Sequence, residues 1–385
     1  MQTNQARAPR GKEEIRRSNL SAALAIVRDR GPLSRSELVE TLGLGRTTVF
    51  ELLAHLSELG LTADAEPTST GVGRPSLVVQ ASRSVGAYVV NPEVHALTVG
   101  ICTLDGRLDT RSHPWTPLPP AQTADLTARL LSELESDLAP ARIAGVGGGI
   151  PGQIDARSRR VISAPSLGWE QVDFAAVLAD RLNLPSFIDN NARLVAATHL
   201  RDGAGSDYSD FIYLLANTGG IGGGIVSGGR LLVGSRGFAG EVGHLHITGR
   251  DAEGSMESLI RRVDLVSALG AGDPDDEQLD ALVATSRDPA VRAVAERQLA
   301  TLGLAVANLV NALDVRLVLL GGFLGSLYRR FPDLLDERLR AFALPAVLEG
   351  LQILPTAHTA DGVLRGAAEL VFTDVVADPL AWATG

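Results

Sequence analysis

Three short apolar runs that lead into glycine turns constrain this chain most. They occupy residues 143–149, 211–215 and 317–320. Runs of this length are typical of buried strands. Amphipathic helical segments alternate with them, at residues 126–138, 192–200, 298–313 and 363–372. This alternation predicts an α/β body of two lobes with a cleft between them. Further strands are expected at 87–90, 97–103, 187–188, 224–226 and 230–233.

Length and composition limit the class of protein. A chain of 385 residues is too long for one compact core, so two or three domains are expected. It contains no run of 18 apolar residues and no apolar leader after its polar N-terminus, so we expect neither a membrane span nor a secretory signal. Cys102 is the only cysteine, which excludes an intramolecular disulfide and a cysteine-rich zinc site and suits the cytoplasm.

The net charge of −10 is spread unevenly along the chain. Residues 1–80 hold 10 Lys and Arg against 9 Asp and Glu, whereas the remainder holds 25 against 36. Any nucleic-acid contact is therefore expected in the first 80 residues. Five of the basic side chains lie within the first 17 residues. They form either an arm that contacts phosphate or a disordered, solvated tail.

The first 80 residues have the pattern of a helix-turn-helix. Helices are predicted at residues 18–30, 35–42 and 46–59, the second opened by the capping box Ser34-Arg35-Ser36-Glu37. A glycine turn at 43–45 precedes the third helix, whose N-terminal face is polar, as in helices that enter the major groove. A hairpin wing is expected at 61–80. The residues predicted to contact DNA are Arg35, Arg46, Thr47, Thr48 and Arg74. A three-helix interaction module without DNA is the alternative.

The pentapeptide Gly240-Glu241-Val242-Gly243-His244 carries the clearest candidate binding chemistry. A carboxylate and an imidazole three residues apart can hold the hydroxyls of a small polyol through charge-assisted hydrogen bonds. The alternative is a surface turn with an incidental pair. A glycine-rich segment at 218–224 and a further acid, Glu257, favour the binding site.

The order of several motifs resembles the ROK family (repressors, open reading frames, kinases). These motifs are Gly73-Arg74-Pro75, Gly149-Ile150-Pro151-Gly152, Asn190-Asn191-Ala192, Gly220-Ile221-Gly222, Gly240-Glu241-x-Gly243-His244 and Gly321-Gly322. The resemblance implies a winged helix-turn-helix at residues 1–80, followed by a two-lobed actin/hexokinase-like body at 81–385. Its smaller lobe would comprise 81–188 with the C-terminal helix, and its larger lobe 189–358. It also implies a homodimer or homotetramer that binds operator DNA and responds to a sugar or sugar phosphate.

The chain departs from the family where a kinase needs its chemistry. The family's D-I-G-G-T phosphate motif corresponds to Asn91-Pro92-Glu93-Val94-His95, which lacks the aspartate and the glycine turn. The family's general base is the aspartate of an N-D-A motif, and that position is Asn191. The threonine of the usual G-T-G-I-G has become Gly219. We therefore predict no catalytic residue, no enzyme activity and no ATP or other cofactor.

The family's zinc cluster is also missing, because residues 245–256 contain no cysteine, so no metal is expected. The polar residues that the resemblance assigns to ligand binding are retained: Asn190, Asn191, Glu241, His244 and Glu257. They either bind a carbohydrate or persist only for packing and hydrogen bonds between the lobes. Arg193 either pairs with an acidic group of the ligand or neutralises a nearby acid.

Three functions are consistent with the sequence. The first is a transcription factor, most simply a repressor of carbohydrate-related genes, that a sugar switches. The second is a sugar kinase with an accessory head. The third is a DNA-binding dimer that senses nothing, with a cleft that is empty, collapsed or plugged, for example by His95 or Arg193.

Overall fold

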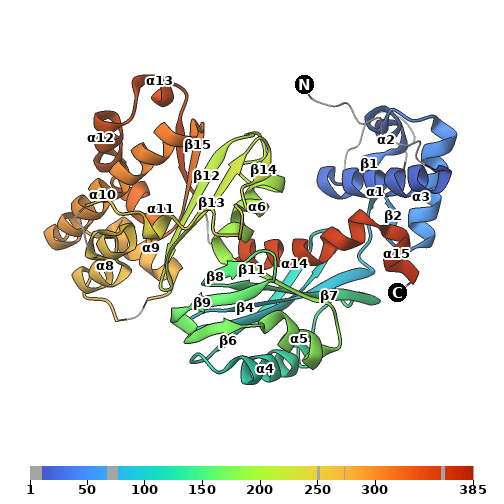
Figure 1. Ribbon diagram of the computed structural model, residues 1–385, viewed down its shortest axis with the longest axis horizontal. Coiled ribbons are helices and arrows are strands. Elements are labelled where there is room, and N and C mark those ends of the chain that lie inside the picture. The colour runs from blue at the N-terminus through green and yellow to red at the C-terminus, as the bar shows by residue number, and fades with distance from the viewer. Residues whose placement is uncertain (1–10, 67–76, 249–251, 273, 357–359, 385) are drawn as a thin grey trace.

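The computed structural model describes residues 11–66, 77–248, 252–272, 274–356 and 360–384. Three bodies are visible in Figure 1: a small helical head, a smaller lobe around one five-stranded sheet, and a larger lobe around a second five-stranded sheet. The C-terminal helix runs along the smaller lobe and reaches the head.

The head is a helix-turn-helix with a three-stranded antiparallel sheet in the order β1-β3-β2. Its elements are α1 (Lys12–Arg30), β1 (Leu33–Ser34), α2 (Arg35–Leu42), α3 (Arg46–Glu58), β2 (Thr62–Ala65) and β3 (Val78–Ala81). The predicted capping box is present: Glu37 N donates to Ser34 Oγ at 3.2 Å, and Ser34 N donates to Glu37 Oε2 at 2.7 Å. The wing tip, including Gly73, Arg74 and Pro75, lies outside the described residues.

The first helix begins at Lys12, six residues before the predicted start at Ser18. Residues 12–17 carry only one apolar side chain, so apolar periodicity gives no sign of a helix there. Arg17 pairs with Glu13 one turn earlier and with Asp378 of the C-terminal segment, and these polar contacts stabilise the extra turns.

The smaller lobe has the sheet order β11-β7-β4-β5-β6. Its elements are β4 (Val85–Pro92), β5 (Ala96–Thr103), β6 (Leu108–Pro114), α4 (Pro120–Ser132), β7 (Arg142–Ile150), α5 (Phe174–Leu182) and β11 (Ser186–Asn190), with a separate small sheet of β8 (Gln153–Asp155), β9 (Arg160–Ala164) and β10 (Trp169–Val172) around η1 (Pro165–Leu167). The helix predicted at 126–138 was misplaced. It starts at Pro120, a residue well suited to a first helical turn, and ends at Ser132.

The larger lobe has the sheet order β14-β13-β12-β15-β16. The strand predicted at 224–226 begins four residues earlier, within the glycine-rich segment, and pairs antiparallel with β12. The elements are β12 (Phe211–Asn217), β13 (Gly220–Ser227), β14 (Arg230–Leu231), η2 (Val242–His244), η3 (Ala252–Gly254), α7 (Met256–Leu259), α8 (Arg262–Ala268), α9 (Asp276–Thr285), α10 (Pro289–Leu313), β15 (Leu317–Gly322), α11 (Phe323–Arg330), α12 (Pro332–Phe342), α13 (Pro345–Leu348) and β16 (Gln352–Pro355).

Three helices connect the bodies. Helix α6 (Asn191–Asp202) packs against β13 of the larger lobe and against α14 (Ala360–Ala377), which covers β4 and β7 of the smaller lobe. Helix α14 and the following α15 (Pro379–Thr384) also contact α1 of the head. One buried apolar cluster accordingly contains Leu24 of α1, Leu56 of α3, Phe372 of α14 and Leu194 of α6. The head is therefore seated on the body through a shared core.

Candidate functional site

A cavity of about 440 Å³ lies between the lobes. The turn after β7, the N-terminus of α6 and the turn between β12 and β13 form part of its wall. All five residues predicted to bind a ligand line it: Asn190, Asn191, Glu241, His244 and Glu257. The structure thus brings together side chains that span 68 positions of the sequence, from Asn190 to Glu257.

Asn190 holds the cavity wall in shape. Its Oδ1 accepts hydrogen bonds from the backbone N–H groups of Ala192 at 2.9 Å and Arg193 at 3.2 Å, so it is the N-cap of α6. Its Nδ2 donates to the carbonyl of Gly152 at 2.8 Å, across to the turn after β7. Most of its hydrogen-bonding capacity is therefore used within the protein, although the side chain lines the cavity.

Asn191 presents a different arrangement. Its Nδ2 donates to Oδ1 of Asn91, at the end of β4, at 3.2 Å, and both side chains are buried. Its own Oδ1 is buried and accepts no hydrogen bond within the described protein. A buried acceptor without a donor is costly. Because this oxygen has no exposed surface here, a ligand hydroxyl would reach it only after the side chain or the lobes shift.

Glu241 and His244 stand side by side, as the pentapeptide predicted. Glu241 Oε2 lies 3.9 Å from His244 Nε2, and Gln153 Nε2 lies 3.3 Å from the same ring nitrogen. Burial raises the pKa of Glu241, and this outweighs the opposing effects of His244 and Arg193. Gln153 lies on β8, a strand that the sequence did not indicate, so sequence analysis missed its part in the site.

Glu257 closes the cavity from the larger lobe. Its Oε2 accepts from the backbone N–H of Ile221 at 3.4 Å. Gly220 has a φ of +118°, and a Cβ there would lie 2.9 Å from that carboxylate oxygen. Glycine at 220 therefore permits both the turn and the close approach of the acid.

Arg193 is directed away from the ligand space. Its guanidinium, buried at the start of α6, forms an ion pair with Asp189 and donates to the carbonyl of Gly237. Of the two roles left open by the sequence, this contact matches the neutralisation of a nearby acid. Neither Arg193 nor His95 is among the residues that line the cavity. The filled cleft considered above is therefore wrong for both side chains.

The stretch that replaces the family's phosphate motif has no glycine turn. Strand β4 continues to Pro92 and stays paired with β5. Glu93 and His95 then line a neighbouring cavity of about 310 Å³, together with Asp275, Asp276 and Arg262. Arg262 is paired with Asp276 at 3.9 Å and donates to the carbonyl of Pro274. Acidic side chains thus dominate the surroundings of this second cavity.

The segment that carries zinc ligands in the family is arranged differently here. Met256 is fully buried, and its N–H donates to the carbonyl of Leu245 at 2.8 Å, while His246 bridges to Ser255. Within the described part of the chain, no three His, Cys, Asp or Glu side chains are grouped to hold a metal ion.

The candidate nucleic-acid face is the start of α3. Arg46, Thr47 and Thr48 are all exposed there, and Phe50 beside them is 45% exposed. Arg35 is also at this surface, but it pairs with Asp64 of β2 at 2.8 Å and lies over the Phe50 ring. The structure places four of the five predicted DNA-binding residues in the head, and Arg74 is outside the described residues.

Two arginines of the predicted basic arm make contacts within the protein. Arg16 lies 3.1 Å from Nδ1 of His55, and Arg17 pairs with Asp378 at 2.8 Å. Arg7 and Arg10 lie outside the described residues. Among the described helices, none is long and apolar enough to cross a membrane.

Comparison with known proteins identifies both repressors and sugar kinases as relatives. The xylose repressor of Caldicellulosiruptor bescii is 25% identical over 397 residues, covering 95% of this chain and 98% of the relative. The glucokinase of Halalkalibacterium halodurans is 28% identical over 247 residues, covering 58% of this chain and 74% of the enzyme.

Among solved structures, a ROK family transcriptional regulator described as a homolog of the E. coli MLC protein superposes with a TM-score of 0.78 at 18% identity. The match covers 96% of this chain and all of that one, so the fold is shared from head to C-terminus. The α/β fold predicted from the sequence, a winged helix-turn-helix before a two-lobed actin/hexokinase-like body, is thereby confirmed. The ROK family model matches residues 94–374, and this chain belongs to the ROK family.

Proposed function

We propose that this protein is a transcriptional repressor that binds operator DNA through α3 and is switched by an uncharged sugar held between the lobes. In this proposal residues 1–80 bind DNA, and the two lobes formed by residues 81–385 enclose the ligand. The xylose repressor relative, similar over almost the whole chain, supports this proposal. A protein of this kind acts on the chromosome, in the cytoplasm.

The observation that carries the proposal is the amide pair of Asn91 and Asn191. Asn191 lines the cavity and donates to Asn91 behind it, and neither amide can accept a hydroxyl proton. Phosphoryl transfer also needs positioning and neutralisation of phosphate charge, and the glycine turn for that purpose is absent after β4. Binding can outlast such changes, because Asn190, Asn191, Glu241, His244 and Glu257 still line the cavity with groups that hydrogen-bond to hydroxyls.

The charges around the cavity favour a neutral ligand over a phosphorylated one. Glu241 and Glu257 both line it, while the buried guanidinium of Arg193, which follows Asn191 on α6, is turned toward Asp189. Carboxylates accept hydrogen bonds from hydroxyls but repel phosphate. A sugar with free hydroxyls therefore fits this wall better than a sugar phosphate.

Sugar binding is proposed to act on DNA through the geometry of a homodimer. Paired heads read two half-sites at a fixed spacing. A ligand that binds one arrangement of the lobes more tightly shifts the population toward it. If that arrangement separates the two α3 helices by the wrong distance, operator affinity falls and repression ends.

Two binding measurements on the full chain test the proposal. The first is the melting temperature with xylose, glucose and N-acetylglucosamine, each compared with its phosphate ester. An uncharged sugar should raise it, because binding to the folded state alone stabilises that state. The second is the gel shift of a duplex selected by the protein from a random pool, with the same sugars titrated in. Stabilisation only by phosphate esters, or an operator affinity that no sugar alters, would refute the proposal.

A sugar kinase remains the alternative that the glucokinase relative supports. Its test is the release of ADP from Mg-ATP in the presence of the sugar that binds. The DNA-binding dimer without a ligand predicts no stabilisation by any sugar. These outcomes separate all three functions.

A further inference from the structure

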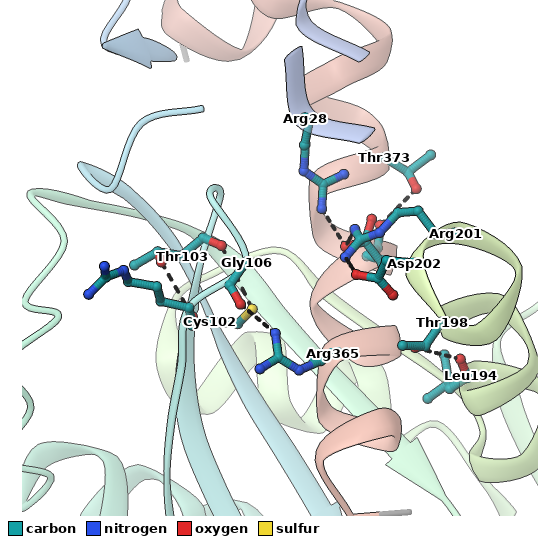
Figure 2. A network of polar contacts seen from close by, with 12 residues as sticks. Arg28, Cys102, Thr103, Gly106, Leu194, Thr198, Arg201, Asp202, Arg365 and Thr373 are labelled. Carbon is teal, nitrogen blue, oxygen red and sulfur yellow. Dashed lines mark hydrogen bonds and ion pairs between the residues drawn. The ribbon is translucent and has the colours of Figure 1, made fainter. Parts of the chain in front are cut away.

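One carboxylate joins the head to the helix that begins at the ligand cavity. Glu369, on α14, forms ion pairs with Arg28 of α1 and with Arg201 of α6. Figure 2 shows Arg28 and Arg201 reaching the same stretch of α14 from two different helices. The three residues come from the head, from the C-terminal helix and from the helix between the lobes.

Helix α6 connects this cluster directly to the cavity. Its first residue is Asn191 and its last turn carries Arg201. Twelve residues of α-helix span about 18 Å, the distance over which a shift at one end is carried to the other if the helix moves as a unit. A displacement of its N-terminus by a bound ligand would then move Arg201 relative to Glu369.

The larger lobe can drive that displacement. Helix α6 packs closely on β13, where a Cβ at Gly222 would lie 3.1 Å from the Cβ of Ala192. On its other side Thr198 Oγ1 donates to the carbonyl of Gly362 on α14 at 3.0 Å. Helix α6 is thus held between the two lobes, and any change in the angle between them acts on it.

The two arginines depend unequally on Glu369. Arg201 has a second acid, Asp202, at 3.0 Å. Arg28 is more deeply buried, with 7% of its side chain exposed. It contacts the ring of Phe372 at 4.8 Å and feels the charges of Asp29 and Asp202, but Glu369 is the carboxylate with which it forms a direct ion pair in the described chain. Removing the carboxylate that pairs with a buried guanidinium strongly destabilises the folded state. Arg201 can exchange Glu369 for Asp202 at low cost. The position of α1 on the body, in contrast, depends on Glu369, the carboxylate that Arg28 and Arg201 share.

We propose that Glu369 relays occupancy of the cavity to the DNA-binding head. This inference rests on the sugar-switched function proposed above. Movement of α6 changes how Glu369 is shared between Arg201 and Arg28, and the change alters the seat of α1 and hence the position of α3. Because coupling between two sites is reciprocal, DNA binding also alters sugar affinity through the same carboxylate.

The test compares Glu369→Gln with the wild type in the full chain. Glutamine keeps the shape and removes the charge. The measured quantity is the Kd for the selected duplex in the presence of a saturating sugar from the panel above, divided by the Kd without sugar. For the variant we expect this ratio to fall at least about fivefold toward 1. We also expect sugar affinity without DNA to stay within about threefold of wild type, a pattern that general loss of structure does not produce.

Two further variants keep the test decisive. Asp280→Asn removes a carboxylate from the pair with Arg329 in the larger lobe, at 2.6 Å, and should leave the ratio unchanged. Arg201→Gln leaves the pair of Arg28 and Glu369 in place and should also lower the ratio, so it decides the matter if Glu369→Gln folds poorly. If Glu369→Gln or Arg201→Gln gives the same ratio as the wild type, the relay is overturned while the proposed function stands. A ratio of 1 in the wild type overturns both.

Discussion

Nδ2 of Asn191 donates a hydrogen bond to Oδ1 of Asn91 at 3.2 Å, and this contact fixes the amide of a residue that lines the ligand cavity. With Nδ2 engaged, the carbonyl oxygen of Asn191 is left as an acceptor without a donor in the described protein. Asn91 stands where the family's phosphate motif has an aspartate, and Asn191 stands where its kinases have their base. On the proposed function, this pair lets a cleft of this family bind a hydroxyl without activating it.

Replacing Asn191 by alanine should weaken binding of the uncharged sugar about tenfold, or about 1.4 kcal/mol, because the ligand loses one acceptor. Asn191→Asp keeps an acceptor, so we expect sugar affinity within about threefold of wild type and no ADP release, since Asn91 and the absent glycine turn still prevent phosphate binding. Calorimetry and a coupled ADP assay measure the two quantities. Asn311→Ala, which removes an amide bonded to the carbonyl of Phe342 in the larger lobe, is the control for affinity. Unchanged affinity in Asn191→Ala would exclude this contact.

Glu241→Gln should stabilise the fold at about pH 8 and leave it unchanged at about pH 4. Burial raises the pKa of Glu241 in the folded state, so between its unfolded and folded pKa the folded protein binds more protons than the unfolded chain. Wild-type stability is therefore complete below the unfolded pKa and falls as the pH rises through the folded pKa. Glutamine does not ionise and removes this loss.

The measurement is urea unfolding of both proteins across that pH range. Glu296→Gln, which alters an exposed pair with Arg292 on α10, should show no such gain at the higher pH. A Glu241→Gln variant that is less stable than wild type at about pH 8 would mean that the carboxylate is held by its partners and not strained by burial.

Arg46→Ala should weaken binding to the selected duplex by about 1–3 kcal/mol, because the exposed guanidinium lies at the start of α3, where a recognition helix meets the base edges and the backbone. Fluorescence anisotropy at two salt concentrations measures the loss and shows whether the lost contact is to phosphate. Arg297→Ala removes an equally exposed arginine from α10 and should have little effect. Equal affinities for both variants would contradict the assignment of α3.

Gly366→Val should destabilise the body by about 1–3 kcal/mol, because a Cβ at this position of α14 would lie 2.5 Å from the carbonyl oxygen of Leu194 on α6. Gly362→Ala is the matched control one turn earlier. Its Cβ would meet Val195 at 3.4 Å, an ordinary contact, and alanine is the better helix former, so stability should stay equal or rise by up to about 1 kcal/mol. Urea unfolding distinguishes them, and equal stabilities would show that α6 and α14 are not tightly packed.

Local signals predicted much of the fold. The capping box at Ser34 fixed the start of α2, and the apolar runs at 211–215 and 317–320 marked two neighbouring strands, β12 and β15. The early turns of α1 gave no such signal, because the contact of Arg17 with Asp378 joins opposite ends of the chain. The strand character of 220–223 was hidden because glycine disfavours strands. Glycines 222–224 permit the close approach of α6 and of residues 240–242.

The site residues that belong to short sequence motifs could be predicted. Those that meet only through tertiary contacts could not. Glu241 and His244 stand together because three residues separate them. The partner of Arg193 was visible in principle, since Asp189 lies four residues earlier. Glu369 had no sequence signal, because its partner Arg28 is 341 positions away.

One titration tests the central claim, that sugar bound between the lobes controls the head without being phosphorylated. The full chain is bound to a labelled duplex, uncharged sugar is added in the presence of Mg-ATP, and anisotropy and ADP are followed together. We expect anisotropy to fall with saturating dependence on sugar while ADP stays at the background level. ADP release in step with sugar, or anisotropy that no sugar changes, would contradict the account.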